Sequence, residues 1–292
     1  MQHQIPRGAA IHDLSCFGRC ALTVIMPTLS VMGYQTVPVP TALLSTHTGG
    51  FDDLHFCDLT PHMEEIAAHF SRLGMTFRSI YTGFLGSSEQ IETVSHFLDT
   101  FGSLPDESGE PPLILIDPVM GDDGSLYSTY THELMCGMRR LSARAQLLTP
   151  NLTEACFLTD TPYRETAKLS ERDTEEYTAE LLEKLSEISK GRIVITGVHF
   201  ADGTLANIGK DTDCSNFCVR LPHEGRSYPG TGDIFASVLL GALLDGDPFP
   251  YACEKAARFT AEVIRDSMEI PSPVRNGVAL ESHLWRLTSH NI

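Results

Sequence analysis

The sequence predicts an α/β fold with a mostly parallel sheet and helices packed on its faces. Short β-rich runs alternate with longer segments of helical periodicity along the chain, as expected for strands joined by crossover helices. The apolar run 113–116 is short and is followed at once by Asp117, as expected for a strand buried on both faces. The 292 residues are 42% hydrophobic, with no internal repeat or low-complexity linker. We therefore expect one domain over residues 1–292.

The first half of the chain begins with a strand at residues 9–11 and a helix at residues 19–32. The apolar residues of that helix recur at helical spacing up to Gly33, although Pro27 lies inside it. Residues 35–44 are β-rich but contain two prolines, which places them at a sheet edge. Helices at 61–73 and 88–101 and a strand at 77–81 follow.

The second half continues the alternation to the end of the chain. Strands are expected at 113–117, 146–148 and 192–196, and an antiparallel pair at 204–208 and 217–221. Helices are expected from residue 152 and at 172–190, 234–244 and 251–266.

Charge and cysteine content exclude several classes of function. A net charge of −17 leaves nothing to neutralise the phosphates of a nucleic acid or an anionic membrane. No apolar run reaches the 18 residues that a membrane span needs, and the first ten residues lack the apolar stretch of a secretory signal. The eight cysteines lack zinc-site spacing, so we expect reduced thiols in a cytoplasmic protein.

The segment Pro229-Gly230-Thr231-Gly232-Asp233 leads directly into the apolar helix expected at 234–244. Its two glycines let the backbone approach a ligand closely. The helix start directs unpaired N–H groups and the positive end of the helix dipole to the same point. This combination predicts an anion hole for a phosphate, with Asp233 placed to take a proton from a hydroxyl group. An ordinary helix start with an aspartate is the alternative.

A second polar cluster follows the strand at 113–116, at the sheet edge where open α/β folds bind ligands. Asp117 and Asp122 belong to an acidic, glycine-containing turn. Such a turn suits a hydrated Mg²⁺ ion or a phosphate clamp, and a solvated turn is the alternative.

Two further clusters follow the strands at 146–148 and 192–196. In the first, Thr149 or Asn151 could cap the next helix together with Glu154. Alternatively, Asn151 and Glu154 hold Mg²⁺-bound water or phosphate oxygens. In the second, the hydroxyl of Thr196 and the bare backbone of Gly197 could line a nucleotide. Phosphoryl transfer needs positioning, charge neutralisation and a base near the acceptor hydroxyl, and the four clusters together supply these parts.

These motifs resemble those of the ribokinase-type small-molecule kinases, and among them the vitamin B6 (pyridoxal, pyridoxine and pyridoxamine) kinases. The matching segments are Asp117-Pro118-Val119-Met120-Gly121-Asp122, Thr149-Pro150-Asn151-Leu152-Thr153-Glu154, Val194-Ile195-Thr196-Gly197 and Gly230-Thr231-Gly232-Asp233. In addition, Ser45-Thr46-His47-Thr48-Gly49 resembles the substrate segment Ser-Asn-His-Thr-Gly of the B6 kinases, and Thr82-Gly83-Phe84 resembles their Thr-Gly-Tyr. The resemblance covers nearly the whole chain and implies a ribokinase-like three-layer αβα sandwich with a mostly parallel central sheet.

The resemblance also implies the reaction and the role of each site residue. The reaction would be Mg²⁺- and ATP-dependent phosphorylation of the 5′-hydroxymethyl group of a B6 vitamer. Asp233 would be the general base, with Gly230, Thr231 and Gly232 as the anion hole. Asp117, Asp122, Asn151 and Glu154 would organise the metal and the ATP phosphates, with Asp117 and Glu154 at the metal; Thr149, Thr196, Gly197, Thr231 and Gly232 would contact the nucleotide. His47, Thr48, Phe84, and either Asp13 or Ser15 would contact the pyridine ring. A monovalent cation (K⁺) and a homodimer are implied in the same way.

The chain departs from the B6 kinase pattern at two places. Phe84 stands where the family has a tyrosine, so ring stacking would survive without a hydroxyl contact. Near the N-terminus, His12-Asp13-Leu14-Ser15 replaces the usual Gln-Ser-His.

Two other functions remain open. The hydroxymethylpyrimidine (phosphate) kinases of thiamine synthesis share the clusters at Asp117 and Asp233, but their glycine-rich N-terminal segment is not obvious here. A non-catalytic vitamer-binding protein is the third interpretation, because a fold alone does not fix a function. The base at Asp233 argues against it.

Overall fold

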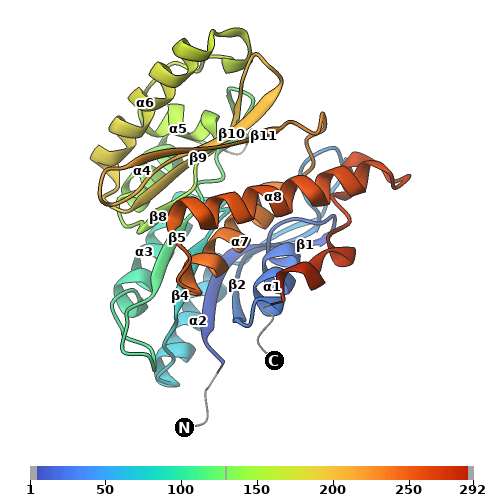
Figure 1. The fold of residues 1–292 in the computed structure, drawn as a ribbon. Helices are drawn as coiled ribbons and strands as arrows, with labels where there is room; N and C mark the ends of the chain where they lie inside the picture. Colours follow the sequence, from blue (N-terminus) through green and yellow to red (C-terminus); the bar gives the residue numbers. More distant parts are fainter. Residues whose placement is uncertain (1–4, 129, 289–292) are drawn as a thin grey trace.

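The computed structural model describes residues 5–128 and 130–288. Its centre is a nine-stranded sheet with the strand order β11-β10-β9-β8-β5-β4-β1-β2-β3. The six strands from β9 to β2 are parallel, whereas β10, β11 and β3 pair antiparallel with their neighbours (Figure 1). A mostly parallel sheet and a terminal antiparallel pair were both predicted, and both are confirmed.

The strands are β1 (Arg7–Phe17), β2 (Gln35–Thr46), β3 (Phe56–Asp58), β4 (Ser79–Thr82), β5 (Leu113–Ile116), β8 (Leu147–Leu148), β9 (Arg192–His199), β10 (Thr204–Lys210) and β11 (Asn216–Pro222), with a small hairpin of β6 (Gly121–Asp122) and β7 (Ser125–Leu126). The α-helices are α1 (Leu22–Val31), α2 (Thr60–Arg72), α3 (Ser88–Phe101), α4 (His132–Ser142), α5 (Leu152–Leu158), α6 (Glu171–Ile188), α7 (Thr231–Leu244) and α8 (Phe249–Met268). Short 3₁₀ turns lie at Thr166–Lys168, Val274–Asn276, Leu280–Ser282 and Leu284–Leu287.

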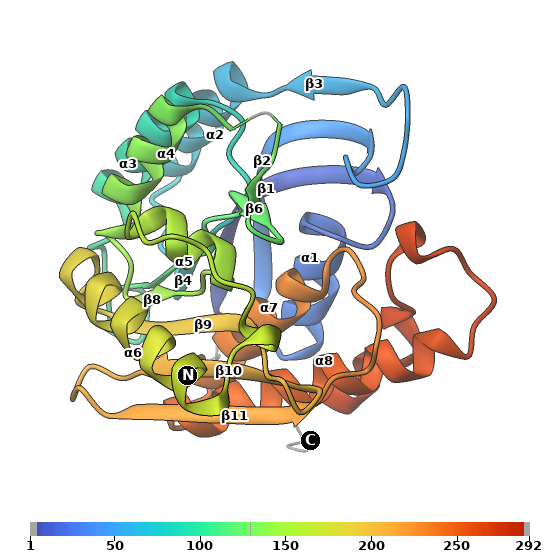
Figure 2. The ribbon, with the colours of Figure 1, turned by 90° about the horizontal axis from the view of Figure 1, so that it is seen from above.

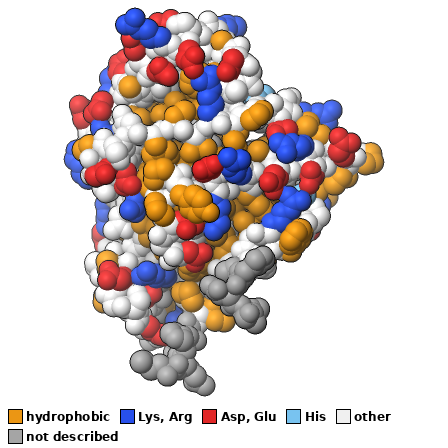
Figure 3. Space-filling model, viewed as in Figure 1, with side chains coloured by type: hydrophobic (Ala, Val, Ile, Leu, Met, Phe, Trp, Pro, Cys, Tyr) orange, Lys and Arg blue, Asp and Glu red, His pale blue; other side chains and the backbone are white. Residues whose placement is uncertain are grey.

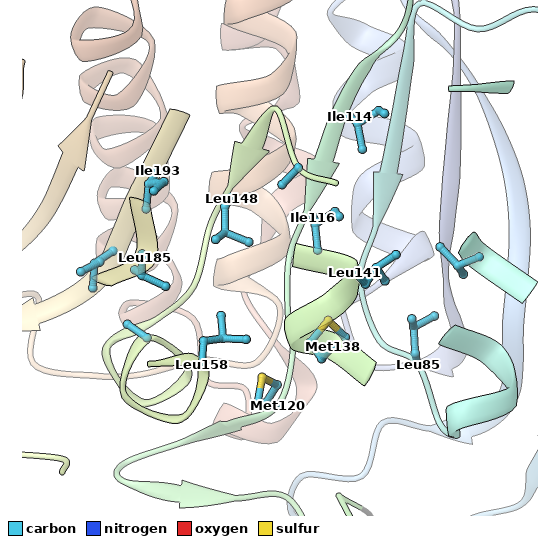
Figure 4. Close-up of a cluster of buried hydrophobic side chains, with 14 of the residues drawn as sticks. Leu85, Ile114, Ile116, Met120, Met138, Leu141, Leu148, Leu158, Leu185 and Ile193 are labelled. Atoms are coloured by element: carbon cyan, nitrogen blue, oxygen red, sulfur yellow. The ribbon is translucent and has the colours of Figure 1, made fainter. Parts of the chain in front are cut away.

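Helices cover both faces of the sheet, as seen from above in Figure 2. Helices α2 to α6 bury their apolar stripes in one cluster, represented by Met63, Val94, Leu141, Ala155 and Leu181. Helices α1, α7 and α8 bury theirs in a second cluster on the other face, represented by Ile25, Leu239 and Ala256. Figure 4 shows part of the first cluster, where strand residues such as Ile116 and Leu148 face Met138 of α4. The three-layer αβα sandwich is therefore confirmed.

The prolines of β2 lie where the sequence predicts them. Pro38 and Pro40 pair with β1 on one side, whereas β3 covers β2 on the other side only from Ala42 to Leu44. The proline-containing half of β2 thus forms an open edge, at which a missing N–H costs no ladder hydrogen bond.

Strand β3, helix α4 and the β6–β7 hairpin were absent from the prediction. Helix α4 does carry an apolar stripe of Leu134, Met138 and Leu141, and its N-cap Thr131 accepts a hydrogen bond from Leu134 N. Its helical pattern is weakened by Gly137, which lets the helix pack closely on Ile91. Strand β3 has three exposed residues and so carries no alternating pattern.

In the part of the chain that the structure describes, no helix is long and apolar enough to cross a membrane. All eight cysteines are free thiols. On the face shown in Figure 3, acidic and basic side chains are interspersed around exposed apolar atoms.

Candidate active site

A cavity of about 890 Å³ lies at the carboxyl ends of the parallel strands. It brings together residues that follow β5 and β8, residues of β9 and the start of α7. The predicted site residues in its lining are Asp117, Asp122, Thr149, Asn151, Glu154, Thr196, Gly197, Gly230, Thr231, Gly232 and Asp233. The predicted ring contacts Asp13, Ser15, His47, Thr48 and Phe84 are not part of this lining; they lie on β1 or in the segments that follow β2 and β4.

The first turn of α7 forms one wall of the cavity. Gly230 is its N-cap, with a left-handed φ of 81°, and a Cβ at this position would lie 2.0 Å from the carbonyl oxygen of Arg19. The position therefore needs glycine both for its backbone angle and for the close approach of the α1 loop. Among the described residues, no side chain caps this helix, so N–H groups of its first turn remain available to a ligand.

Asp233 occupies the third position of α7, and another segment holds each of its carboxylate oxygens. Its Oδ2 accepts a hydrogen bond of 2.7 Å from the backbone N–H of Ala21, at the start of α1. Its Oδ1 lies 3.2 Å from Nε2 of His12 on β1. Ala21 has φ 52° and ψ −139°, a conformation that residues with a Cβ rarely adopt.

His12 is buried on β1 between two carboxylates. Its Nδ1 lies 2.8 Å from Oδ1 of Asp13, and Oδ2 of Asp13 accepts a hydrogen bond of 2.9 Å from the Ser15 hydroxyl. Burial acts to lower the pKa of His12, but its contacts with Asp13 and Asp233 outweigh burial and raise the pKa to about 10. Burial likewise acts to raise the pKa of Asp13, and the hydrogen bond and charge of His12 reverse this effect and lower it.

On the opposite side of the cavity, Asn151 and Glu154 form the start of α5. Asn151 Oδ1 accepts a bond from Glu154 N (2.9 Å), and Glu154 Oε2 accepts one from Asn151 N (2.8 Å). The capping interpretation is thus confirmed for Asn151 rather than for Thr149, whose buried hydroxyl has no hydrogen-bond partner among the described residues. Asn151 Nδ2 also donates to the carbonyl of Gly121 (2.8 Å), which attaches the β6–β7 hairpin to α5.

Asp117 and Glu154 are buried next to each other and are only 8% and 3% exposed. Burial, followed by the charges of Glu154 and Asp233, raises the pKa of Asp117 well above its usual range. Burial also raises the pKa of Glu154 to about 7, although backbone N–H groups of Asn151 and Met120 act against the shift. Asp122 lies on the exposed β6–β7 hairpin at the rim.

His47 connects the segment after β2 to the C-terminal part of the chain. Its Nε2 donates to the Arg275 carbonyl (2.7 Å), and its Nδ1 accepts from Gly49 N (3.0 Å). Both ring nitrogens are therefore engaged by backbone in this structure. Thr48 is exposed and Phe84 is partly exposed.

Sequence reasoning missed His12, Ala21 and Gly83 as parts of the site. A Cβ on Gly83 would lie 1.9 Å from Cδ2 of His12, so this glycine provides the space for the imidazole ring. One local signal existed, because a histidine next to an aspartate inside an apolar strand must find a partner for each buried polar group. Asp233, the partner of His12 on the other side of the site, is more than 200 residues away and carries no local signal.

Fold and site together define a ribokinase-type small-molecule kinase. The profile of the phosphomethylpyrimidine kinase family matches residues 12–276. The chain therefore belongs to that family, which also takes in pyridoxal kinases and hydroxymethylpyrimidine kinases.

The similar proteins carry names of both activities. A protein of Bacteroides thetaiotaomicron, assigned as a candidate phosphomethylpyrimidine kinase and crystallised with pyridoxal, is 37% identical with a TM-score of 0.88, over 98% of this chain and 96% of that one. Pyridoxal kinase of Lactobacillus plantarum is 27% identical with a TM-score of 0.86, over 97% of each chain. A thiamine biosynthesis bifunctional protein of Geobacter sulfurreducens is 25% identical over 96% of this chain, which spans only 53% of that longer protein.

Proposed function

We propose that this kinase phosphorylates the 5′-hydroxymethyl group of a B6 vitamer, with ATP as donor and Asp233 as general base. The observation that carries the choice of substrate is the relative from Bacteroides thetaiotaomicron, whose crystals contain pyridoxal and which matches this chain over nearly its full length. The His47-Thr48 segment supports the same choice, because it resembles the substrate segment of the B6 kinases.

The site supplies what phosphoryl transfer needs from the protein. The vitamer hydroxyl oxygen forms a bond to the γ-phosphorus as the bond from that phosphorus to the β–γ bridging oxygen breaks and ADP leaves with the electron pair. Asp233 receives the hydroxyl proton. The free N–H groups at the start of α7 face the charge that develops on the transferred group.

Asp117 fits a hydrated Mg²⁺ ion better than Glu154 does. Both oxygens of Glu154 already accept backbone hydrogen bonds, from Met120 N (2.9 Å) and Asn151 N (2.8 Å). In the described ranges, no cluster of three or more potential metal-binding side chains occurs. Mg²⁺ commonly takes one or two carboxylates and completes its shell with water and phosphate oxygens, so Asp117 would hold it, whereas Glu154 holds the backbone of Met120 and Asn151 in place. The ion would neutralise phosphate charge.

The test is ADP formation with pyridoxal, pyridoxine, pyridoxamine and hydroxymethylpyrimidine as separate acceptors. We expect turnover with at least one vitamer, and a loss in kcat of about 10³-fold in Asp233→Asn. Asp52→Asn, which alters an exposed carboxylate outside the cavity, serves as the control and should leave kcat unchanged. Tight vitamer binding without turnover on any acceptor would instead establish a binding protein.

The second candidate is hydroxymethylpyrimidine or its phosphate as acceptor. The family profile and the thiamine biosynthesis relative favour it. Its mechanism would be the same, because both substrates present a hydroxymethyl group on a flat nitrogen heterocycle. Turnover on hydroxymethylpyrimidine alone, abolished by Asp233→Asn, would decide for this substrate. A monovalent cation, a homodimer and a cytoplasmic location stay predictions.

A further inference from the structure

We propose that His12, held by Asp13, is a positioning residue that fixes the carboxylate of Asp233 for proton transfer. The proposal rests on the proposed function of Asp233 as the base. It concerns residues at which this chain departs from the B6 kinase pattern, since His12-Asp13-Leu14-Ser15 replaces the usual Gln-Ser-His.

The hydrogen-bond geometry identifies which imidazole nitrogen faces Asp233 with a hydrogen. Nδ1 lies 2.9 Å from the backbone N–H of Asp13 and 2.8 Å from its Oδ1. If Nδ1 accepts a hydrogen bond from the Asp13 N–H, the ring is neutral and its hydrogen is on Nε2. If Nδ1 instead donates to the Asp13 carboxylate while Nε2 faces the Asp233 carboxylate, the ring carries hydrogens on both nitrogens. In both cases Nε2–H points towards Oδ1 of Asp233, at 3.2 Å.

Within the described residues, the contact with Asp233 is the interaction available to Nε2 of His12. The nitrogen is completely buried, and it forms no well-aligned hydrogen bond within the described residues. Donor–base contacts are commonly long in proteins without substrate and shorten when the substrate arrives. A buried donor that points at the base, and that lacks another partner, is therefore placed for the loaded site.

Steric constraints hold the imidazole in place. Gly83 leaves just enough space for its edge, since a Cβ there would lie 1.9 Å from Cδ2. Tyr81 of β4 meets the ring edge-on, with centroids 6.4 Å apart. Because His12 cannot swing away, one oxygen of Asp233 faces Nε2 of His12 at 3.2 Å, and the other accepts a hydrogen bond from Ala21 N.

The charged and titratable groups around His12 come from four elements. They are Asp13 on β1, Asp233 on α7, Tyr81 on β4 and Asp117 after β5. A positive imidazole balances part of this negative field, which otherwise would repel the phosphates of ATP.

The experiment compares His12→Leu and His12→Gln with two control variants, His283→Leu and His283→Gln. His283 is a matched control because it is also 3% exposed and also contacts an aspartate, with Nε2 2.7 Å from Asp266 Oδ2. We expect His12→Leu to lower kcat by about 100-fold, with the KM values of vitamer and Mg·ATP within about three-fold. Glutamine can donate to Asp233, so His12→Gln should recover at least about ten-fold of the loss. The His283 variants should lower the unfolding temperature without lowering kcat.

A folded His12→Leu enzyme with kcat within two-fold of wild type would overturn the proposal, as would a rise in KM for the vitamer at unchanged kcat. If His12→Leu does not fold, Asp13→Asn decides by the same criteria. An NMR titration of His12 in wild type and Asp233→Asn needs no turnover. A lower His12 pKa in the variant supports the contact, and an unchanged pKa contradicts it. Absence of kinase activity in the wild type would refute the proposed function and leave this titration as the test of the contact.

Discussion

The carboxylates at the two ends of the cavity have opposite surroundings. The end at Asp233, proposed to bind the acceptor hydroxyl, is here called the acceptor end. The end at Asp117 and Glu154, proposed to bind the ATP phosphates, is called the phosphate end. At the acceptor end, His12 lies between Asp13 and Asp233, and Ala21 N binds the remaining oxygen of Asp233. At the phosphate end, Asp117 and Glu154 are buried side by side, and their mutual repulsion adds to the cost of burial.

This difference indicates which end is complete before ligands bind. The acceptor end already orients the carboxylate of Asp233, the proposed base, and such preorganisation lowers the barrier of a reaction. At the phosphate end, the charge of His12 compensates only part of the repulsion around Asp117, and a cation would relieve the rest. We therefore infer that the acceptor end is rigid in the free enzyme and that Mg·ATP completes the phosphate end. The predictions below test this contrast.

The largest effect is expected from adding a methyl group to a glycine at each end. Gly230→Ala should cost about 3 kcal/mol or more in the free energy of unfolding, because its φ is 81° and the new Cβ would meet Arg19 O at 2.0 Å. Gly197→Ala should cost only about 1 kcal/mol, because its φ of 71° is similar but nothing lies within 4 Å of the added Cβ. Urea unfolding of both variants measures the difference. Equal costs would show that the acceptor end is no more tightly packed.

Sequence reasoning located the parts of the site that depend on short-range chemistry. The Gly230–Asp233 helix start and the Asn151–Glu154 cap were predictable because their hydrogen bonds and backbone angles arise within four residues. The strand-end aspartate, Asp117, was predictable because parallel strands bring their carboxyl ends to one edge.

The rest of the acceptor end could not be predicted from one sequence. The contact of His12 with Asp233 spans β1 and α7, and its space depends on Gly83 from a third segment. The hydrogen bond from Ala21 N to Asp233 requires a positive φ at Ala21, which is unfavourable for alanine and is not expected from its sequence. These features follow from tertiary packing, which overrides local preference.

The second prediction concerns pH and the acceptor end. His12 has a pKa of about 10 in the folded protein against 6.5 in an unfolded chain, so the folded state binds more protons between these values. Its stabilisation is fully present below pH 6.5 and is lost as the pH rises towards 10. Glu154 has a raised pKa and gives a slope of the same sign at lower pH. The difference between wild type and His12→Gln isolates the histidine.

Urea midpoints at pH 6, 8 and 10 measure this dependence. The wild type should lose more stability than His12→Gln between pH 6 and 10. Parallel curves for the two proteins would mean that His12 carries no additional proton in the folded state, and the acceptor end would then lack its balancing charge.

The third prediction concerns the phosphate end. Asp117→Asn removes a buried, repelled carboxylate, so the free protein should gain about 1 kcal/mol, whereas the KM for Mg·ATP should rise about ten-fold. Thermal unfolding without nucleotide and initial rates over a range of Mg·ATP concentrations measure the two effects. The exposed Asp52→Asn should change neither quantity. Loss of stability in Asp117→Asn would show that the phosphate end is already satisfied in the free enzyme.

The smallest effect is expected at Ala21, which has a strained backbone and binds Asp233 through its N–H. Its φ of 52° and ψ of −139° favour glycine, so Ala21→Gly should stabilise the protein by about 0.5 kcal/mol or slightly more. The N–H that holds Asp233 is retained, so kcat should stay within about three-fold of wild type. Ala143→Gly, at a helical φ of −64°, is the matched control and should destabilise by about 0.5–1 kcal/mol. If both variants lose stability equally, the angle at Ala21 carries no strain. The rigidity of the acceptor end would then depend on His12 and Gly230 alone.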